Sequence, residues 1–320
     1  RRRGGGRLGV DATYYYNSTE NQIMSVPLPN SSGYTGRFLN AGEVVNKGVE
    51  VVLNATPVQV QNGLNWDVRL NWSRNRSEIV ELAEGIDTYQ IANPYGGQVL
   101  AIEGGRMGDM YGRGFQRSPS GEIIYEDGLP QLTEEIKKVG NYNPDWMAGL
   151  GMNFQYKQFT FDFLFDLRYG GRLYSYTHAT GIEGGTLTGT TAHRGENVTG
   201  DGVVRNPDGS FSQNTESAPY VTWLRRYYAR NNLESNSFDA TWLKLREVKL
   251  GYKFSSQLLQ SLPIRNASIA LVGRNLFLWT DVPHIDPETT SMYGGEIVPG
   301  FEVHQIPSTR SVALDITIQI

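Results

Sequence analysis

The most constraining feature of the sequence is the regular alternation in its last eleven residues, 310–320. From residue 311 onward, one set of alternate positions is apolar throughout, and the other set is polar or small. The apolar set is Val312, Leu314, Ile316, Ile318 and Ile320. A period of two predicts a β-strand with one apolar face. About eleven residues is also the length of a tilted strand that crosses a bilayer. We therefore expect the rest of the chain to consist of similar strands.

Seven earlier segments show the same alternation. They cover residues 8–16, 45–56, 64–75, 146–157, 159–169, 238–254 and 265–278. In the sixth segment the phase inverts, because Leu243 and Leu245 are apolar in its first half whereas Val248 and Leu250 are apolar in its second. We expect a β-bulge near residues 246–248, or an upper half of the strand that lies beyond the membrane.

The connectors between these segments alternate between long and short. The long connectors are residues 17–44, 77–145, 170–237 and 279–309, and the others are tight turns. Outer-membrane barrels have short periplasmic turns and long extracellular loops. This pattern predicts an all-β, antiparallel, up-and-down transmembrane β-barrel with its C-terminus in the periplasm and its long loops outside the cell. Within the loops we expect a hairpin near residues 123–125 and a helical turn at 133–139.

A soluble β-sandwich also alternates polar and apolar residues, so alternation alone does not decide the class. The strands here are longer than the ~5–6 residues usual in globular proteins, and such long loops are rare in compact domains. No apolar run reaches the ~20 residues of a transmembrane helix. The formal net charge of -4 gives no nucleic-acid footprint, and the chain has no cysteine. Eight strands close only a narrow, filled barrel, so we expect part of a wider barrel.

The polar face of the predicted sheet supplies the first group of candidate residues. We expect the following to face the lumen: Arg69, Asp162, Asp166, Arg168 and Asp315. Two carboxylates on one strand could suggest hydrolysis, but the neighbouring arginine favours a charge network. The sequence contains no catalytic motif, so we expect no enzyme activity. The four histidines follow no zinc spacing, and we expect them in solvated loops.

The long loops supply the second group. The best candidate for contact with a substrate or partner is the aromatic and basic run at residues 223–230. Its members are Trp223, Arg225, Arg226, Tyr227 and Tyr228, and we add Tyr111, Asp201 and Asp208 from the other loops. The alternative is that the run packs against neighbouring loops. Asp201 and Asp208 lie in Gly-rich and Asn-rich segments for which turn formation is a better explanation than calcium binding. We expect no cofactor, and calcium on an extracellular loop is kept as an alternative.

Several motifs resemble SusC/RagA-type TonB-dependent outer-membrane transporters. The run Phe238-Asp239-Ala240-Thr241-Trp242-Leu243-Lys244-Leu245-Arg246-Glu247-Val248-Lys249-Leu250-Gly251-Tyr252 is similar to a hallmark near the C-terminus of that family. Val272-Gly273-Arg274-Asn275-Leu276 followed by Asp286-Pro287-Glu288 resembles its next signature, and Asn46-Lys47-Gly48-Val49-Glu50 also matches. The resemblance implies that residues 1–320 are the C-terminal part of such a barrel, about the last eight strands of a 22-stranded wall. The resemblance also implies that the family's plug and N-terminal extension lie outside residues 1–320.

The resemblance further implies import of a glycan or peptide across the outer membrane of a Bacteroidetes-type bacterium. The implied partners are a SusD-like surface lipoprotein, the TonB–ExbB–ExbD system acting through the N-terminal region, and outer-membrane lipid. Two alternatives of other classes stay open: a passive porin-like barrel, and a secreted β-rich binding or adhesin module.

Overall fold

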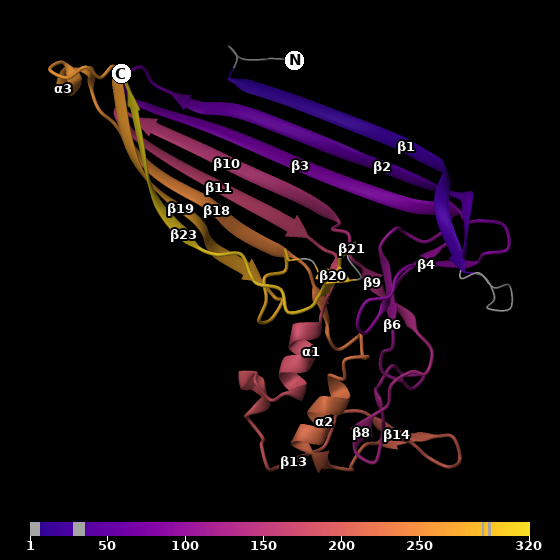
Figure 1. Ribbon diagram of the computed structural model, residues 1–320. Coiled ribbons are helices and arrows are strands. Elements are labelled where there is room, and N and C mark those ends of the chain that lie inside the picture. The colour runs from indigo at the N-terminus through magenta and orange to yellow at the C-terminus, as the bar shows by residue number, and fades with distance from the viewer. Residues whose placement is uncertain (1–6, 28–35, 290, 294–295) are drawn as a thin grey trace.

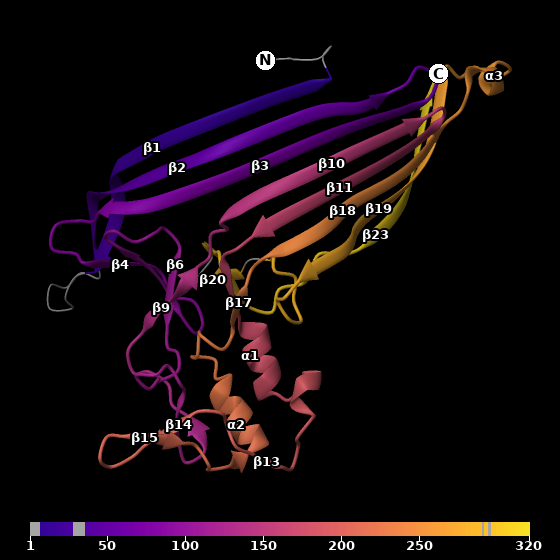
Figure 2. The ribbon, with the colours of Figure 1, turned by 180° about the vertical axis from the view of Figure 1, so that it is seen from behind.

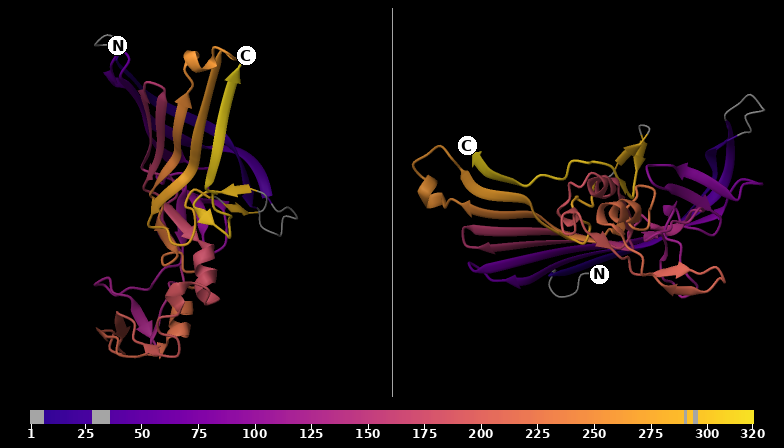
Figure 3. Two further views of the ribbon diagram at one scale, coloured as in Figure 1. Left: turned by 90° about the vertical axis from the view of Figure 1, so that its left-hand side faces the viewer. Right: turned by 90° about the horizontal axis from the view of Figure 1, so that it is seen from below.

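The fold is built on one curved antiparallel sheet of eight long strands. The computed structural model describes residues 7–27, 36–289, 291–293 and 296–320 (Figure 1). The sheet contains β1 (Leu8–Pro27), β2 (Gly36–Gln59), β3 (Leu64–Glu81), β10 (Trp146–Tyr156), β11 (Phe159–Tyr169), β18 (Trp242–Lys253), β19 (Asn266–Thr280) and β23 (Ser311–Gln319). Each strand pairs with the strand that precedes it in this series, so the eight predicted strands and their up-and-down order are confirmed. Figure 3 shows the sheet bowed and open, with β1 and β23 at its two edges.

The outward face of the sheet carries rows of exposed apolar side chains. Leu250, Leu271 and Leu314 lie opposite one another on β18, β19 and β23, and they are 52%, 53% and 60% exposed. A water-soluble surface rarely carries such a continuous apolar area, whereas a strand facing lipid requires it. On the opposite face, Lys249 of β18 forms an ion pair with Asp315 of β23 at 2.9 Å, across Ala270 and Val272 of β19. No helix among the described residues is long and apolar enough to cross a membrane.

The predicted β-bulge is present at Arg246. On the β11 side, Leu164 lies opposite Glu247 and Phe165 lies opposite Leu245, so Arg246 has no partner position. The pairing of β18 with β19 shifts at the same place. The bulge explains the phase inversion seen in the sequence. One extra residue in a strand moves every later side chain to the other face of the sheet.

Three details of the connectors differ from the predictions. Residues 17–27 and 36–44 continue β1 and β2 as one long ladder, since backbone pairing needs no apolar alternation outside lipid. The predicted helical turn at 133–139 is wrong: β9 (Lys137–Asn141) pairs there with β6 (Asp109–Gly112). The start of the sixth predicted strand instead forms β17 (Ser237–Asp239), which pairs with β12 (Arg172–Ser175). The hairpin near residue 124 is confirmed, by β7 (Ile124–Glu126) and β8 (Leu129–Pro130).

The long connectors 82–145, 170–241 and 281–310 fold together into a body that we call the loop lobe. It lies beyond one end of the sheet, opposite the C-terminus (Figure 1). Besides the elements named above, it contains β4 (Thr88–Ala92), β5 (Gln98–Ile102), α1 (Tyr176–Glu183), η2 (Thr188–Thr190), β13 (Asn197–Val198), β14 (Val203–Arg205), β15 (Phe211–Gln213), β16 (Ala218–Pro219), α2 (Tyr220–Tyr227), β20 (Ser291–Tyr293), β21 (Glu296–Val298) and β22 (Phe301–Glu302). The short helix α3 (Ser256–Leu259) lies at the other end of the sheet.

The loop lobe has its own hydrophobic core, to which all three connectors contribute. Val99 and Met110 come from the first, Tyr174 and Leu233 from the second, and Phe301 from the third. Strand β12 pairs in parallel with β22, and β14 pairs in parallel with β7, so each pairing joins two connectors. The lobe is therefore a packed unit that can hold side chains in fixed positions.

Candidate functional site

The polar face of the sheet carries lateral pairs between neighbouring strands. Asp162 accepts a hydrogen bond from Asn153, and Asp315 pairs with Lys249 across β19. Asp162 also lines an open hollow of about 700 Å³ together with Asp67 and Arg69, near the turn end of β1, β2, β3, β10 and β11. The structure thus brings Arg69 and Asp162, two residues predicted to face the lumen, together at one hollow. The hollow offers charged and amide groups suited to a polar occupant.

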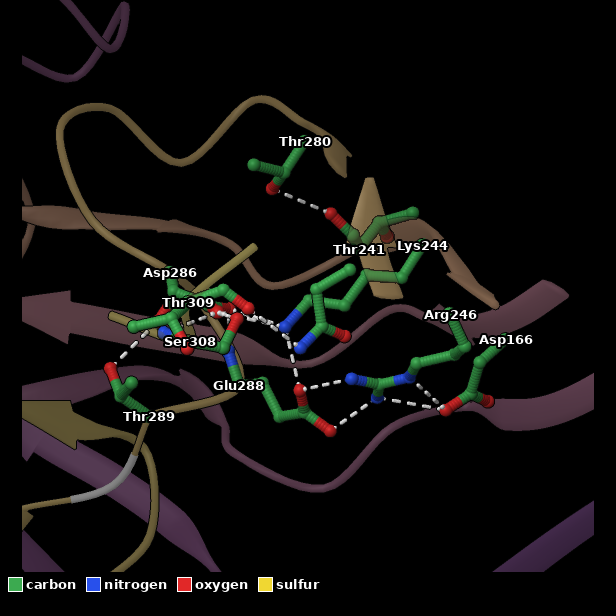
Figure 4. Close-up of polar contacts among 11 residues, drawn as sticks. Asp166, Thr241, Lys244, Arg246, Thr280, Asp286, Glu288, Thr289, Ser308 and Thr309 are labelled. Carbon is green, nitrogen blue, oxygen red and sulfur yellow. Dashed lines mark hydrogen bonds and ion pairs between the residues drawn. The ribbon is translucent and has the colours of Figure 1, made fainter. Parts of the chain in front are cut away.

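A denser cluster lies at the other end of this face, around the bulge (Figure 4). The Arg246 guanidinium donates to Asp166 Oδ2, with an Nη2–Oδ2 distance of 2.9 Å, and also contacts both carboxylate oxygens of Glu288. Because the bulge releases Arg246 from the regular ladder, its side chain can reach both β11 and the third connector. Asp166, a predicted lumen residue, is therefore one member of a larger network.

Lys244 is the centre of that network. Its side chain is 2% exposed, and its ammonium lies 2.7 Å from Asp286 Oδ1 and 2.6 Å from Glu288 Oε2. A buried lysine requires such partners, because an unpaired charge away from water is costly. The cation comes from a motif on β18, and the anions come from a motif about forty residues later, on the third connector. The fold brings these two motifs into direct contact through charged hydrogen bonds.

The acidic side of the network is shaped by a tight turn. Asp286 Oδ1 accepts the backbone N–H of Glu288 at 3.1 Å, while Oδ2 accepts the hydroxyl of Ser308. Burial alone would raise the pKa values of Asp286 and Glu288. Hydrogen bonds from Lys244 to both, from Ser308 to Asp286 and from Arg246 to Glu288 outweigh burial and lower both values. Both carboxyls are therefore held ionised, and the cluster fastens the third connector to the barrel wall.

Sequence reasoning did not assign a site to Lys244, Asp286 or Glu288. The available signals were the phase inversion at Arg246 and a separate acidic motif, and neither shows that the two segments meet. Arg168, at the end of β11, donates to the carbonyl of Tyr142 in the first connector, so it joins the wall to the loop lobe.

The aromatic and basic run lies largely on α2, where it divides between two environments. Trp223 and Tyr227 line an open hollow of about 490 Å³, which we call the distal hollow, and Asp201 lies at the same hollow. Its complete lining is Ile123, Tyr125, Val198, Thr199, Gly200, Asp201, Tyr220, Trp223 and Tyr227. Three predicted residues from two separate sequence stretches thus share one surface. Figure 2 shows α2, β13 and β14 at the end of the loop lobe away from the sheet.

The other members of the run are engaged in packing. Arg225 donates to the carbonyl of Glu183 at 3.2 Å, and Arg226 donates to the carbonyl of Pro130 at 3.1 Å. The ring of Tyr228 lies against that of His178, with centroids 5.1 Å apart. For these three residues, packing between loops describes the observed contacts.

The two remaining loop candidates lie apart from the distal hollow. Asp208 accepts the backbone N–H and hydroxyl of Ser210, so it serves a turn. Tyr111 lies on β6, paired in register with Lys138. Burial raises the pKa of Tyr111.

One histidine departs from the expectation of solvated loops. His178 is buried on α1, and its Nδ1 lies 3.0 Å from Asn236 Oδ1. Burial lowers the pKa of His178, which favours the neutral imidazole. In the described part of the chain, no three His, Asp or Glu side chains are placed to hold a metal ion.

A curved up-and-down sheet with an apolar outer face and a polar inner face defines a wall segment of a membrane β-barrel. Residues 3–276 match the model of the family described as TonB dependent receptor-like, beta-barrel. The chain belongs to this family, whose members are located in the outer membrane. The resemblance to SusC/RagA-type transporters is confirmed.

Individual relatives agree with this placement. The chain is similar to two TonB-dependent receptors of Formosa agariphila: P3, with 26% identity over 88% of this chain and 29% of the relative, and P26, with 26% identity over 98% and 33%. It also resembles the structure of the RagAB peptide transporter, with 19% identity over 98% of this chain and 33% of that chain and a TM-score of 0.69. The RagAB peptide importer in its open-open state gives a TM-score of 0.70 at 18% identity. At this identity the structural likeness shows the fold alone, and the chain spans about a third of the length of the curated relatives it matches.

Proposed function

We propose that this chain forms part of the wall and the extracellular loops of an outer-membrane importer for a large nutrient, an oligosaccharide or a peptide. The observation that carries the proposal is the family match over residues 3–276, together with a fold that follows a peptide transporter over 98% of the chain. In this proposal a SusD-like surface lipoprotein covers the loop lobe, and TonB supplies energy through a segment outside this chain. The C-terminus lies in the periplasm and the loop lobe outside the cell.

Uptake in cells tests the function. A strain lacking the full-length transporter should lose uptake of one class of oligosaccharide or peptide, and complementation should restore it. Removal of TonB or addition of a protonophore should stop uptake equally, because the proposed import is active. Uptake that persists without energy would favour a passive porin-like barrel, and secretion without membrane insertion would favour an adhesin or binding module.

Orientation can be tested with single cysteines, since this chain contains none. Thr222→Cys places a thiol on the exposed surface of α2, and Gln61→Cys places one in the turn between β2 and β3. In a full-length, cysteine-free background, an impermeant maleimide should label only Thr222→Cys on intact cells. Labelling of Gln61→Cys alone would reverse the proposed orientation.

A further inference from the structure

The distal hollow combines a fixed aromatic platform with a free carboxylate. The rings of Trp223 and Tyr227 are stacked, with centroids 4.8 Å apart and planes at 26°. Tyr227 in turn packs against the buried ring of Phe115, at 4.7 Å. Trp223 is therefore the last of three rings packed in a row, and it lines the hollow. A ring held in this way needs no reordering when a flat ligand covers it, which lowers the entropic cost of binding.

The loop at residues 199–201 also lines the distal hollow. This loop lies directly on Tyr125, because a Cβ at Gly200 would be 2.3 Å from that ring. Asp201, next in the chain, is exposed at the hollow, and within the described residues its carboxylate has no hydrogen bond or ion pair. Its oxygens can therefore accept hydrogen bonds from a ligand.

The charges around the hollow select the class of ligand. Asp201 disfavours an anion inside it. Arg226 lies about one helical turn beyond Trp223 on α2, outside the lining of the hollow, and its side chain donates to the neutral carbonyl of Pro130. Its positive charge disfavours a cationic peptide next to Trp223. A neutral ligand with one apolar face and several hydroxyl groups satisfies both constraints.

We propose that the distal hollow binds a neutral sugar unit, with Trp223 stacking on the C–H face of the ring and the Asp201 carboxylate accepting its hydroxyls. The inference rests on the proposed import function and makes it more specific, since it selects an oligosaccharide over a peptide. The volume of about 490 Å³ lies within the range of small-molecule sites. Its position away from the sheet makes it an outer contact that is separate from the lumen.

The test is calorimetric titration of the purified full-length transporter in detergent. The probes are cello-, laminari-, xylo- and mannopentaose, with pentalysine and a hyaluronan pentasaccharide as cationic and anionic comparisons. At least one neutral pentasaccharide should bind. Trp223→Ala and Asp201→Asn should each weaken that binding by about tenfold or more, as expected when a hydrogen bond to a charged group or a central anchor is lost.

Matched variants control for folding. Asp208→Asn changes an exposed aspartate on the same connector, and Val221→Ala changes an exposed residue on the same helix; both should bind like wild type. Trp223→Phe keeps an aromatic platform and should retain most of the affinity. The inference is overturned if no neutral sugar binds, or if pentalysine binds with the same dependence on Trp223 and Asp201. It is also overturned if the variants release the lipoprotein partner while sugar affinity is unchanged.

This titration requires no energy source, so its failure is distinct from a failure of the proposed function. Uptake that continues without TonB would contradict active import and leave the sugar titration unaffected. Absence of sugar binding with intact TonB-dependent uptake would contradict only the inference.

Discussion

At the scale of single residues, the strongest constraint in the molecule is the burial of Lys244 between two carboxylates. The lysine and Asp286 are 2% and 3% exposed at their side chains, so water cannot replace either partner. Glu288 is shared between Lys244 and Arg246, and Arg246 is shared between Glu288 and Asp166. The removal of Lys244 therefore leaves Asp286 without a cation, and Glu288 keeps only its contact with Arg246.

Lys244→Met should destabilise the protein by about 3–5 kcal/mol, because it leaves buried charge unpaired. The unfolding midpoint in urea, measured on the full-length protein by heat-modifiable gel mobility, reports this change. Lys249→Met is the matched control on the same strand. Its pair with Asp315 is 34% and 47% exposed, so its loss should cost about 0–1 kcal/mol. Equal losses in the two variants would contradict the central role of Lys244.

The same cluster predicts a loss of stability in acid. The folded-state pKa values of Asp286 and Glu288 are depressed, so their contribution is present above the ordinary carboxyl pKa of about 4 and is lost as pH falls through the folded values. The urea midpoint should therefore drop as the pH falls below about 4. Asp286→Asn should show a smaller drop, whereas Asp281→Asn, at an exposed position, should behave like wild type. If the urea midpoint of Asp286→Asn fell in acid as far as that of the wild type, this assignment would be refuted.

At the scale of elements, the sequence predicts the features that local periodicity determines and fails where distant segments meet. The eight long strands and the bulge at Arg246 were predictable, because lipid on one side imposes a strict alternation. The extensions of β1 and β2 were missed, since residues 17–22 are polar and a ladder outside lipid has no alternating apolar pattern. The Lys244 cluster was missed because nothing local indicates that Asp286 folds back onto β18. In the loop lobe, Trp223 and Asp201 were found by residue type, but their shared hollow depends on packing with Tyr125.

Adjacent residues of β23 point to opposite faces of the sheet, so substitutions at adjacent positions should have unequal effects on stability. Ile316 lies opposite Ile269 on the apolar side, and Thr317 lies opposite Ser268 on the polar side. Ile316→Arg should therefore cost about 2–4 kcal/mol near the bilayer midplane, and Thr317→Arg much less. Assembly of the full-length transporter into outer membranes, followed by heat-modifiable mobility, measures the difference. Similar defects in both variants would mean that the assigned faces are wrong.

At the scale of the whole molecule, the loop lobe behaves as a second body joined to the wall. Its core joins residues from all three long connectors, while Arg168 and the Lys244 cluster fasten it to the sheet. A second cluster also joins the two bodies, because Val44 of β2 and Ile79 of β3 pack with Leu82 and Ala101 of the first connector. The core around Phe301 lies within the loop lobe, so damage there need not disturb the sheet. This arrangement suits a wall that stays fixed in lipid and loops that contact ligands.

Phe301→Ala should loosen the loop lobe and leave the sheet intact. Phe301 is fully buried against Tyr174, with ring centroids 5.6 Å apart, and its truncation should cost about 3–5 kcal/mol. Hydrogen exchange should rise in β12 and β22 and stay unchanged in β10 and β11. Phe211→Ala, at a half-buried ring on β15, is the control and should change exchange little. Faster exchange throughout the sheet would show that the two bodies are not separate.

The pairing of β12 with β22 also constrains the order in which parts of the protein can fold. Ser175 donates to Glu302 across 127 residues of chain, and Tyr174 meets Phe301 over the same span. Contacts of such long sequence separation form late, because the intervening chain must first be placed. The loop lobe cannot close until the third connector has crossed to the same side as the first two. Until the third connector has folded back, the aromatic core of the loop lobe is exposed to water. We therefore expect the nascent protein to be most prone to aggregation before its last connector and final strand are in place.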